Sequence, residues 1–183
     1  KQFIEIGGVP VIVITVRAFL AVEEIDMAYV GIKPDWHEYT NELFERFGID
    51  KERVRVIDGG ADRNGTVMNI AEAIVAEHGK NEGDIILTHD AVRPFVTEKI
   101  IKDNIEAMAK HSACGTYMPA ADTIIRSDGE KVRETLNRSE LYQAQTPQTF
   151  KLGDLRRNYY SLSEEQNKKM TDTSSVCTAC NED

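Results

Sequence analysis

Short apolar runs alternate along the chain with segments in which apolar residues recur at helical spacing. Residues 25–32, 53–57 and 84–88 are rich in Ile, Val and Leu, which favours strands. The segments that follow carry apolar residues three and four positions apart and predict helices, the first two of which end at Gly48 and Gly79. This alternation predicts an α/β fold, with right-handed crossovers and a mostly parallel sheet flanked by helices.

Two stretches depart from that pattern. Residues 11–20 fit a strand by their β-branched side chains and a helix by the spacing of their apolar positions, and we favour the helix. After a strand predicted at 114–118, residues 123–126 and 131–135 alternate and are joined by the turn Ser127-Asp128-Gly129, which predicts a hairpin. A two-stranded ribbon alone is marginal in water, so we expect it to lie against another surface, such as a second subunit.

The last part of the chain carries weaker signals. We interpret Thr146-Pro147-Gln148 as a turn before a helix, and the chain reads helical from Leu152 to its end. Cys177 and Cys180 have the spacing of half a zinc site or of a redox pair. Since a structural zinc site needs four ligands and only Cys114 remains, we favour neither role.

Composition narrows the class of protein. The 183 residues predict one main domain, which we expect to span residues 1–183 and to bury a core without disulfides. The 22 Lys and Arg against 31 Asp and Glu give a net charge of -9, which argues against nucleic acid or an anionic membrane as partner. Any phosphate site would therefore be a local basic pocket. The longest apolar run, residues 9–16, is too short to span a bilayer, and three cysteines fit a reducing compartment, so we expect a cytoplasmic protein.

Asp90 stands just after the strand predicted at 84–88, in the run His89-Asp90-Ala91-Val92-Arg93-Pro94. Ligands of open α/β sheets bind at the carboxyl ends of strands, so Asp90 could reach a metal or a ribose and Arg93 could pair with a phosphate. The structural alternative is that Asp90 pairs with Arg93 in a loop. For His89, a packed or hydrogen-bonded role is favoured over that of a ligand.

The segment Gly59-Gly60-Ala61-Asp62-Arg63-Asn64-Gly65-Thr66 is a glycine-rich connection from strand to helix. Glycines let the backbone approach a ligand closely, and the following helix start offers N–H donors to an anion or to the edge of a base. Its spacing matches neither a Walker A loop nor G-x-G-x-x-G. An ordinary turn remains the alternative.

Taken in order, these segments resemble one family. Lys1-Gln2-Phe3, the Gly59-Gly60 loop, the Asp90-to-Pro94 run, Asp122-Thr123, Arg138, Thr146-Pro147-Gln148 and Thr171-Asp172 occur in the sequence order of the CTP-dependent polyol-phosphate cytidylyltransferases. Within that group, Gln2-Phe3, the flanking Val92 and Phe95, and residues 145–150 are more similar to the ribitol-5-phosphate branch than to its relative, the 2-C-methyl-D-erythritol 4-phosphate branch.

The resemblance implies a Rossmann-like nucleotidyltransferase fold that dimerises through a projecting β-arm at about 121–142. It also implies that the polyol phosphate attacks the α-phosphorus of CTP and releases pyrophosphate, with Mg²⁺ present. The favoured acceptor is D-ribitol 5-phosphate, as in teichoic acid biosynthesis, and the alternative is 2-C-methyl-D-erythritol 4-phosphate of isoprenoid biosynthesis. A nucleotide-binding homologue without catalysis is a further alternative, and a dinucleotide dehydrogenase is disfavoured by the lack of G-x-G-x-x-G.

Roles for single residues follow from the same resemblance. The catalytic set would be Lys1, which neutralises phosphate charge, with Asp90 and Arg93. Gly59, Gly60 and Thr66 would bind the cytosine, supported by Arg63, and Asp90 would hold the metal or the ribose. The polyol-phosphate pocket would take, partly across a dimer, Arg93, Thr123, Arg138, Thr146 and Thr171.

The sequence departs from the family pattern in two respects. Relatives carry a glycine-rich phosphate loop before the Lys1 motif and a later segment with a substrate-binding Lys. Neither is in the 183 residues. We therefore expect the 183 residues to be part of a longer protein and to be inactive alone. Ala61 and Gly65 also stand where relatives often have acidic residues.

Overall fold

The computed structural model describes residues 1–163, 165–166 and 173. In chain order, its elements are β1 (Glu5–Ile6), β2 (Val9–Pro10), α1 (Val11–Leu20), β3 (Ala28–Ile32), the 3₁₀ turn η1 (Pro34–Trp36), α2 (His37–Arg46), β4 (Val54–Asp58), α3 (Arg63–His78), β5 (Ile85–Thr88), α4 (Glu98–Ala107), β6 (Ala113–Pro119), β7 (Ile125–Ser127), β8 (Val132–Thr135), the 3₁₀ turn η2 (Arg138–Glu140), β9 (Tyr142–Lys151) and α5 (Leu152–Ser161).

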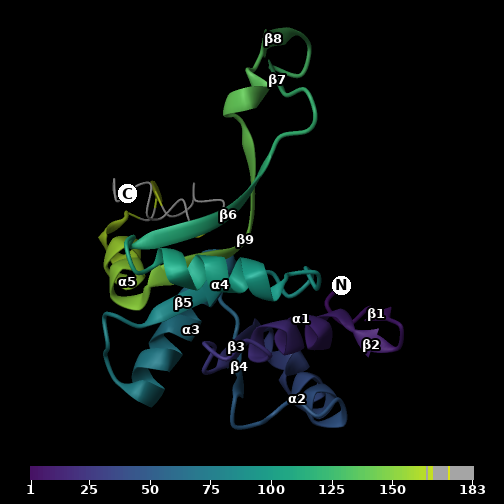
Figure 1. Ribbon diagram of the computed structural model, residues 1–183, viewed down its shortest axis with the longest axis vertical. Helices are drawn as coiled ribbons and strands as arrows, with labels where there is room; N and C mark the ends of the chain where they lie inside the picture. The colour runs from purple at the N-terminus through teal and green to yellow at the C-terminus, as the bar shows by residue number, and fades with distance from the viewer. Residues whose placement is uncertain (164, 167–172, 174–183) are drawn as a thin grey trace.

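Strands and helices alternate through the body of the molecule, which confirms the predicted α/β class (Figure 1). β3 and β4 pair in parallel, from Ala28 opposite Val54 to Ile32 opposite Asp58. A second sheet has the order β5-β9-β6, and β9 runs antiparallel to both neighbours. The parallel crossover architecture therefore carries an antiparallel insertion that the sequence did not predict.

That insertion corrects the interpretation of residues 146–148. Thr146-Pro147-Gln148 lies inside β9 and is not a turn before a helix. Pro147 has no N–H to give a ladder, but the β6–β9 register shifts between Gly115 and Tyr117, so the proline falls in an irregularity. There the Thr116 hydroxyl donates to the Pro147 carbonyl oxygen at 2.9 Å. A proline is tolerated in a central strand because the bulge removes the need for its donor.

The helical predictions hold with one exception. Residues 11–20 are helical, and α4 begins after Thr97, whose hydroxyl accepts a hydrogen bond from the Ile100 N–H. The last helix ends at Ser161 and does not continue through the described residues that follow. Ser163 and Gln166 form a reciprocal capping pair, since the Gln166 side chain accepts from the Ser163 N–H at 2.9 Å and the Ser163 hydroxyl accepts from the Gln166 N–H at 3.3 Å. Leu162 has an extended backbone and ends α5, and the S-x-x-Q pattern after it is that of a new helix start.

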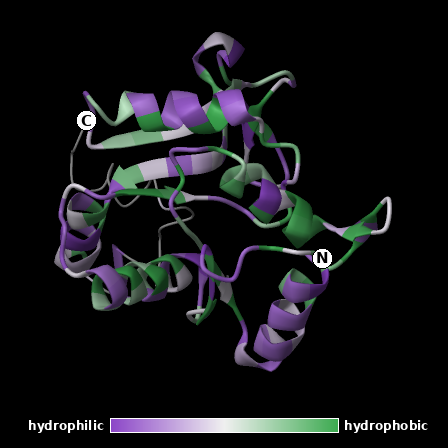
Figure 2. Cartoon of the chain, turned by 60° about the horizontal axis from the view of Figure 1, so that its bottom comes forward, coloured by the Kyte–Doolittle hydropathy of each residue, from purple (hydrophilic) through white to green (hydrophobic). Residues whose placement is uncertain are grey.

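Amphipathic helices build the core on both sides of the strands. Hydrophobic and hydrophilic residues alternate along the helices (Figure 2). α1 and α2 pack on β4 through a cluster that includes Ile12, Val13 and Phe44, each at most 2% exposed. α3, β9 and α5 share a second cluster that includes Ala71 and Leu155. Among the described residues, no helix has the length and apolar content needed to cross a membrane.

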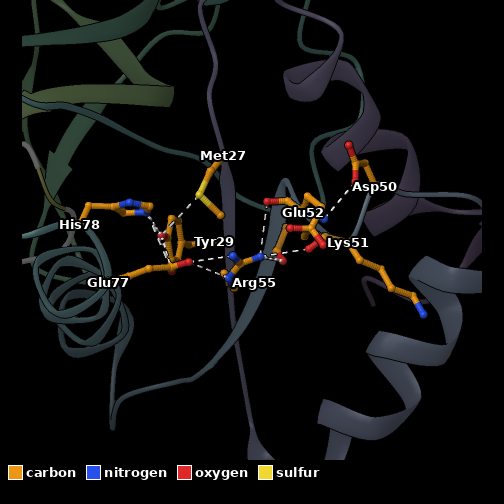
Figure 3. Close-up of polar contacts among 9 residues, drawn as sticks. Met27, Tyr29, Asp50, Lys51, Glu52, Arg55, Glu77 and His78 are labelled. Carbon is orange, nitrogen blue, oxygen red and sulfur yellow. Dashed lines mark hydrogen bonds and ion pairs between the residues drawn. The ribbon is translucent and has the colours of Figure 1, made fainter.

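A polar cluster ties β3, β4 and α3 together near the amino ends of the two strands (Figure 3). The Tyr29 hydroxyl donates to Glu77 Oε2 at 2.8 Å and lies 2.8 Å from His78 Nε2. Arg55 donates to Glu77 Oε1 through Nε at 3.0 Å and Nη2 at 2.7 Å. Partial burial, together with Glu77, raises the pKa of Tyr29 to about 12. These contacts hold β3, β4 and α3 together at the end of the strands opposite their carboxyl ends.

The predicted hairpin is present. β7 and β8 pair antiparallel on an arm that projects from the body at the far ends of β6 and β9 (Figure 1). The turn is closed by Asp128 Oδ1, which accepts from the N–H groups of Glu130 and Lys131 at 3.0 and 2.8 Å. The arm carries exposed apolar side chains, with Ile125 and Val132 about half exposed or more.

Candidate functional site

A tightly closed loop joins the carboxyl end of β4 to the start of α3. Asp62 caps the helix, because its Oδ1 accepts from the Gly65 N–H at 2.7 Å. The Thr66 hydroxyl donates to the Asp62 carbonyl oxygen at 2.8 Å and accepts from the Gly60 N–H at 2.9 Å. The hydroxyl therefore fixes the loop from inside and keeps one free acceptor position for a ligand.

Gly60 allows this loop to close. A Cβ atom at Gly60 would stand 2.4 Å from the Gly65 carbonyl carbon and 2.6 Å from the Thr66 nitrogen, both backbone atoms. Gly31 of β3 is equally constrained, since a Cβ there would lie 2.2 Å from Thr66 Cγ2. The glycines are needed for close packing of the loop and helix start against β3, and the predicted close approach of this backbone to a ligand stays a prediction.

Beside the loop lies a hollow of about 590 Å³ at the carboxyl ends of β3 and β4. Its walls come from the first residues of the chain, the loop after β3 and the glycine loop, and include Lys1, Phe3, Trp36, Gly59, Gly60, Arg63 and Thr66. The Lys1 residue is exposed and brings positive charge to this hollow in an otherwise acidic protein. A cation beside glycine backbone and a hydroxyl suits a ligand that has both phosphate and a polar ring.

Asp90 lies at the end of β5 between two arginines. Its Oδ2 accepts from Arg93 Nε at 2.9 Å, and its Oδ1 lies 3.4 Å from Arg63 Nε. The Arg93 guanidinium also donates to Gln145 Oε1, and the Asp90 N–H donates to the Thr146 hydroxyl at 3.4 Å. About a third of the Asp90 side chain remains exposed. The strand end thus presents two partly neutralised cations and one accessible carboxylate.

Arg63 connects this group to a distant part of the chain through a contact that local sequence patterns do not predict. Its Nη1 donates to the Thr173 hydroxyl at 2.6 Å, across 110 residues of sequence. Thr173 is 1% exposed, and its hydroxyl lies 3.4 Å from Asn64 Oδ1. No local pattern signals such a contact, because the two residues lie far apart in the sequence and only folding brings them together.

His89 is a structural residue, as the sequence favoured. Its Nε2 lies 3.0 Å from the Arg93 carbonyl oxygen, and its ring packs on Phe19 with centroids 4.9 Å apart. Burial lowers the pKa of His89 below its ordinary value and so favours the neutral ring. A neutral imidazole in this place orients the Asp90-to-Arg93 loop.

The structure groups most of the predicted site residues. Lys1, Gly59, Gly60, Arg63 and Thr66 line one hollow. Arg63 and Thr66 also border a larger cavity of about 820 Å³ between β3 and β5, which Asp90 shares, so the glycine loop and the strand-end carboxylate adjoin.

Two of the predicted residues are not brought to this group. Thr123 and Arg138 belong to the projecting arm, where Arg138 Nη1 donates to the Ala121 carbonyl oxygen at 2.9 Å (Figure 1). Thr171 lies outside the described residues, as do Cys177 and Cys180.

The side chains near the site determine which metal ion it could bind. Within the described part of the chain, no cluster of three or more His, Cys, Asp or Glu side chains could hold an ion alone. Asp90 is a single oxygen donor beside the cationic hollow. Mg²⁺ commonly binds one or two carboxylates and takes its other ligands from substrate phosphates and water, so this set fits Mg²⁺ held together with a nucleotide.

A glycine-closed loop beside a lysine at the carboxyl ends of parallel strands is typical of α/β proteins that bind nucleotides. The sequence profile of one family, described as IspD: 2-C-methyl-D-erythritol 4-phosphate cytidylyltransferase, matches residues 1–182. The chain belongs to this family, and it is a cytidylyltransferase that uses CTP.

Solved structures agree with the assignment. A 4-diphosphocytidyl-2C-methyl-D-erythritol synthase is 29% identical, with a TM-score of 0.85 over 100% of this chain and 82% of that chain. The enzyme of the same description from Anaerococcus prevotii DSM 20548 is 27% identical, with a TM-score of 0.81 over 98% of this chain and 75% of its own. The 2-C-methyl-D-erythritol 4-phosphate cytidylyltransferase of Francisella tularensis is 25% identical, with a TM-score of 0.84 over 100% and 81%.

Proposed function

We propose that the protein transfers CMP from CTP to 2-C-methyl-D-erythritol 4-phosphate. The observation that supports this acceptor most is the family match over residues 1–182, whose description names it. The sequence favoured D-ribitol 5-phosphate and ranked methylerythritol phosphate second, and the comparisons favour the second. Branch preferences rest on a few side chains, such as Gln2 and Phe95, whereas the profile weighs nearly the whole chain.

The proposed reaction forms and breaks one bond each at the α-phosphorus. A phosphate oxygen of the polyol phosphate attacks, the bond to the β-phosphate oxygen breaks, and pyrophosphate leaves. Catalysis then depends on positioning and on stabilising the charge that develops on the phosphoryl oxygens. Lys1 faces the triphosphate in this proposal, and Arg93, oriented by Asp90 at 2.9 Å, faces the acceptor phosphate together with Thr146.

The cytosine lies against the glycine loop in this proposal. The free acceptor position of the Thr66 hydroxyl suits the cytosine amino group, which is a donor. Asp90 would hold Mg²⁺ jointly with the phosphates of CTP, and the ion would supply neutralisation of phosphate charge when bound.

We further propose that the arm pairs with a second copy of the chain. Thr123 and Arg138 stand at the two ends of the β7–β8 hairpin, outside the Asp90 group of their own chain. The exposed apolar side chains of the arm, Ile125 and Val132 among them, need a surface to cover them. A two-fold dimer supplies the same surface to both copies and would bring Arg138 toward the partner's site.

A matrix of substrates tests the function. The protein, expressed from its complete coding sequence, is given CTP, UTP, ATP or GTP with Mg²⁺ and with methylerythritol phosphate, ribitol 5-phosphate or no acceptor, and pyrophosphate is measured. We expect release only with CTP and an acceptor, with the highest kcat/KM for methylerythritol phosphate. A higher kcat/KM for ribitol phosphate would refute the proposed acceptor, and release with ATP or GTP, or none with any acceptor, would refute the proposed reaction.

A further inference from the structure

The hollow beside the glycine loop has an aromatic wall. Trp36, the single tryptophan of the sequence, lines this hollow together with Gly59, Gly60 and Thr66. Its side chain is 45% exposed, which is a large opening for an indole ring. The indole is among the side chains that gain most from being covered, and tryptophan is enriched at binding interfaces.

Neighbouring residues hold the ring in place. Phe3 packs on it with ring centroids 5.1 Å apart and planes inclined by 35°, and Tyr39 meets it edge-on at 5.9 Å. The backbone is fixed as well, since the Trp36 N–H donates to the Lys33 carbonyl oxygen at 2.9 Å and its own carbonyl accepts from the Thr40 hydroxyl at 2.6 Å. The indole is therefore a rigid platform set before a ligand arrives.

The ligand that suits this platform is a planar ring. The same hollow is also lined by hydrogen-bonding groups, the Gly60 backbone and the Thr66 hydroxyl, which suit the edge of a base. An edge contact alone leaves both faces of a base to water, and an aromatic side chain is the usual cover for a base face. Lys1, on the rim of the same hollow, provides charge for the phosphates attached to that base.

We propose that Trp36 is the surface on which the cytosine ring of CTP stacks. The proposal rests on the function proposed above and assigns the face of the base to Trp36, as the glycine loop takes its edge. Stacking accepts any base, so Trp36 contributes affinity for the nucleoside, and the choice of cytosine over other bases falls to the loop.

A second role for the ring must be distinguished. Phe3 is two residues from Lys1, so Trp36 could act only by holding Phe3 and thereby Lys1. Tyr39 also contacts Phe3, with centroids 5.0 Å apart, but it is not among the residues that line the hollow. Tyr39→Leu therefore removes a ring from the same aromatic group without removing the wall, and it is a matched control.

Trp36 is the single tryptophan of the 183 residues, and the difference in emission between the wild type and Trp36→Phe isolates its indole. Fluorescence of the wild-type protein is titrated with CTP, CMP, pyrophosphate and tripolyphosphate. We expect CTP and CMP to shift or quench the emission and the two base-free anions to leave it nearly unchanged. Equal changes with tripolyphosphate and CTP would overturn the proposal.

Calorimetric titration of variants completes the test. Trp36→Leu should raise the Kd for CTP about ten- to a hundredfold, the range expected for one lost base–aromatic stack, and leave the Kd for tripolyphosphate nearly unchanged. Trp36→Phe should recover most of the affinity, and Tyr39→Leu should change it little. An unchanged Kd in Trp36→Leu, or an equal loss in Tyr39→Leu, would overturn the stacking role.

The test of stacking and the test of the proposed function can fail independently. A base-dependent change in emission without pyrophosphate release would support the stacking role and contradict the transferase proposal. Normal turnover without any base-dependent change would do the reverse.

Discussion

Asp90 and Gly60 are the two residues at the carboxyl ends of the strands whose contacts are most demanding. Asp90 joins Arg63 and Arg93 in one electrostatic group, and Gly60 lets the glycine loop pack against α3. Asp90 contributes charge, and Gly60 allows close packing because it has no side chain. Substitutions at the two positions should therefore affect different properties of the protein.

Asp90→Asn should reduce kcat by about 10²- to 10³-fold, because an amide can replace the shape of the carboxylate but not its charge toward a metal and two guanidiniums. Its effect on the free energy of unfolding should stay within about 1 kcal/mol, since the group is partly exposed. Steady-state kinetics and urea unfolding measure both. Asp103→Asn, which breaks an exposed ion pair with Lys99 on α4, is the control and should leave kcat unchanged. Normal turnover in Asp90→Asn would make Asp90 a purely structural residue.

Gly60→Ala should reduce the free energy of unfolding by about 1–3 kcal/mol and weaken CTP binding, because its Cβ would lie within 3 Å of backbone atoms that must then move. Gly59→Ala is the matched control, since a Cβ there would meet Ile32 backbone atoms at an ordinary 3.4 Å. Chemical denaturation and calorimetry measure the two effects. Equal behaviour of the two variants would show that the loop does not depend on close approach at Gly60.

Among the elements, β3, β4 and α3 form the frame that holds the glycine loop. The cluster of Tyr29, Arg55, Glu77 and His78 joins these three elements at the end opposite the site (Figure 3). Because Tyr29 belongs to β3 and Glu77 to α3, their hydrogen bond links the strand that bears Gly31 to the helix that bears Thr66. The frame should therefore weaken when Tyr29 ionises.

The pKa of Tyr29 gives this cluster a pH dependence. Its value of about 12 in the folded state lies above the ordinary 10.0, so the stabilisation is complete below pH 10 and is lost as the pH rises to about 12. The unfolding midpoint of the wild type should fall more steeply across this window than that of Tyr29→Phe. Tyr142→Phe, which changes an exposed tyrosine of β9, should follow the wild type. Parallel curves for wild type and Tyr29→Phe would contradict the assignment.

How much of the fold the sequence predicts depends on the range of the interactions. The helices and the strands β3 to β6 follow local patterns, as do the hairpin turn at Ser127-Asp128-Gly129 and the glycine loop. β9 escaped prediction because its partners β5 and β6 lie far back in the sequence and because Pro147 signals a turn. The contact from Arg63 to Thr173 and the wall formed by Trp36 escaped for the same reason: only folding brings these residues to the site.

On the scale of the whole molecule, the arm is the feature without a partner inside the described chain. Its two strands pair only with each other, while Thr123 and Arg138 stand at their ends. In the proposed dimer, a second copy would give these residues a function and cover the apolar side chains.

Deleting residues 122–137 should therefore convert a dimer to a monomer, as measured by light scattering at matched concentration. Arg138→Ala should raise KM for the polyol phosphate and leave CTP binding nearly unchanged, because it removes a charge-assisted contact to one phosphate only. Arg157→Ala, at an exposed arginine of α5, is the control. A dimer that survives the deletion with normal KM would disprove the role of the arm.

In the proposed reaction a phosphate oxygen of the acceptor attacks the α-phosphorus of CTP, and isotopic labelling follows each phosphorus atom to its product. The protein is incubated with methylerythritol phosphate and Mg²⁺ and with CTP labelled at either the α- or the γ-phosphorus, and the products are separated. We predict that the α label appears in a cytidine diphosphate ester of the polyol and the γ label in pyrophosphate. Transfer of the γ label to the acceptor, or its release as inorganic phosphate, would contradict the account.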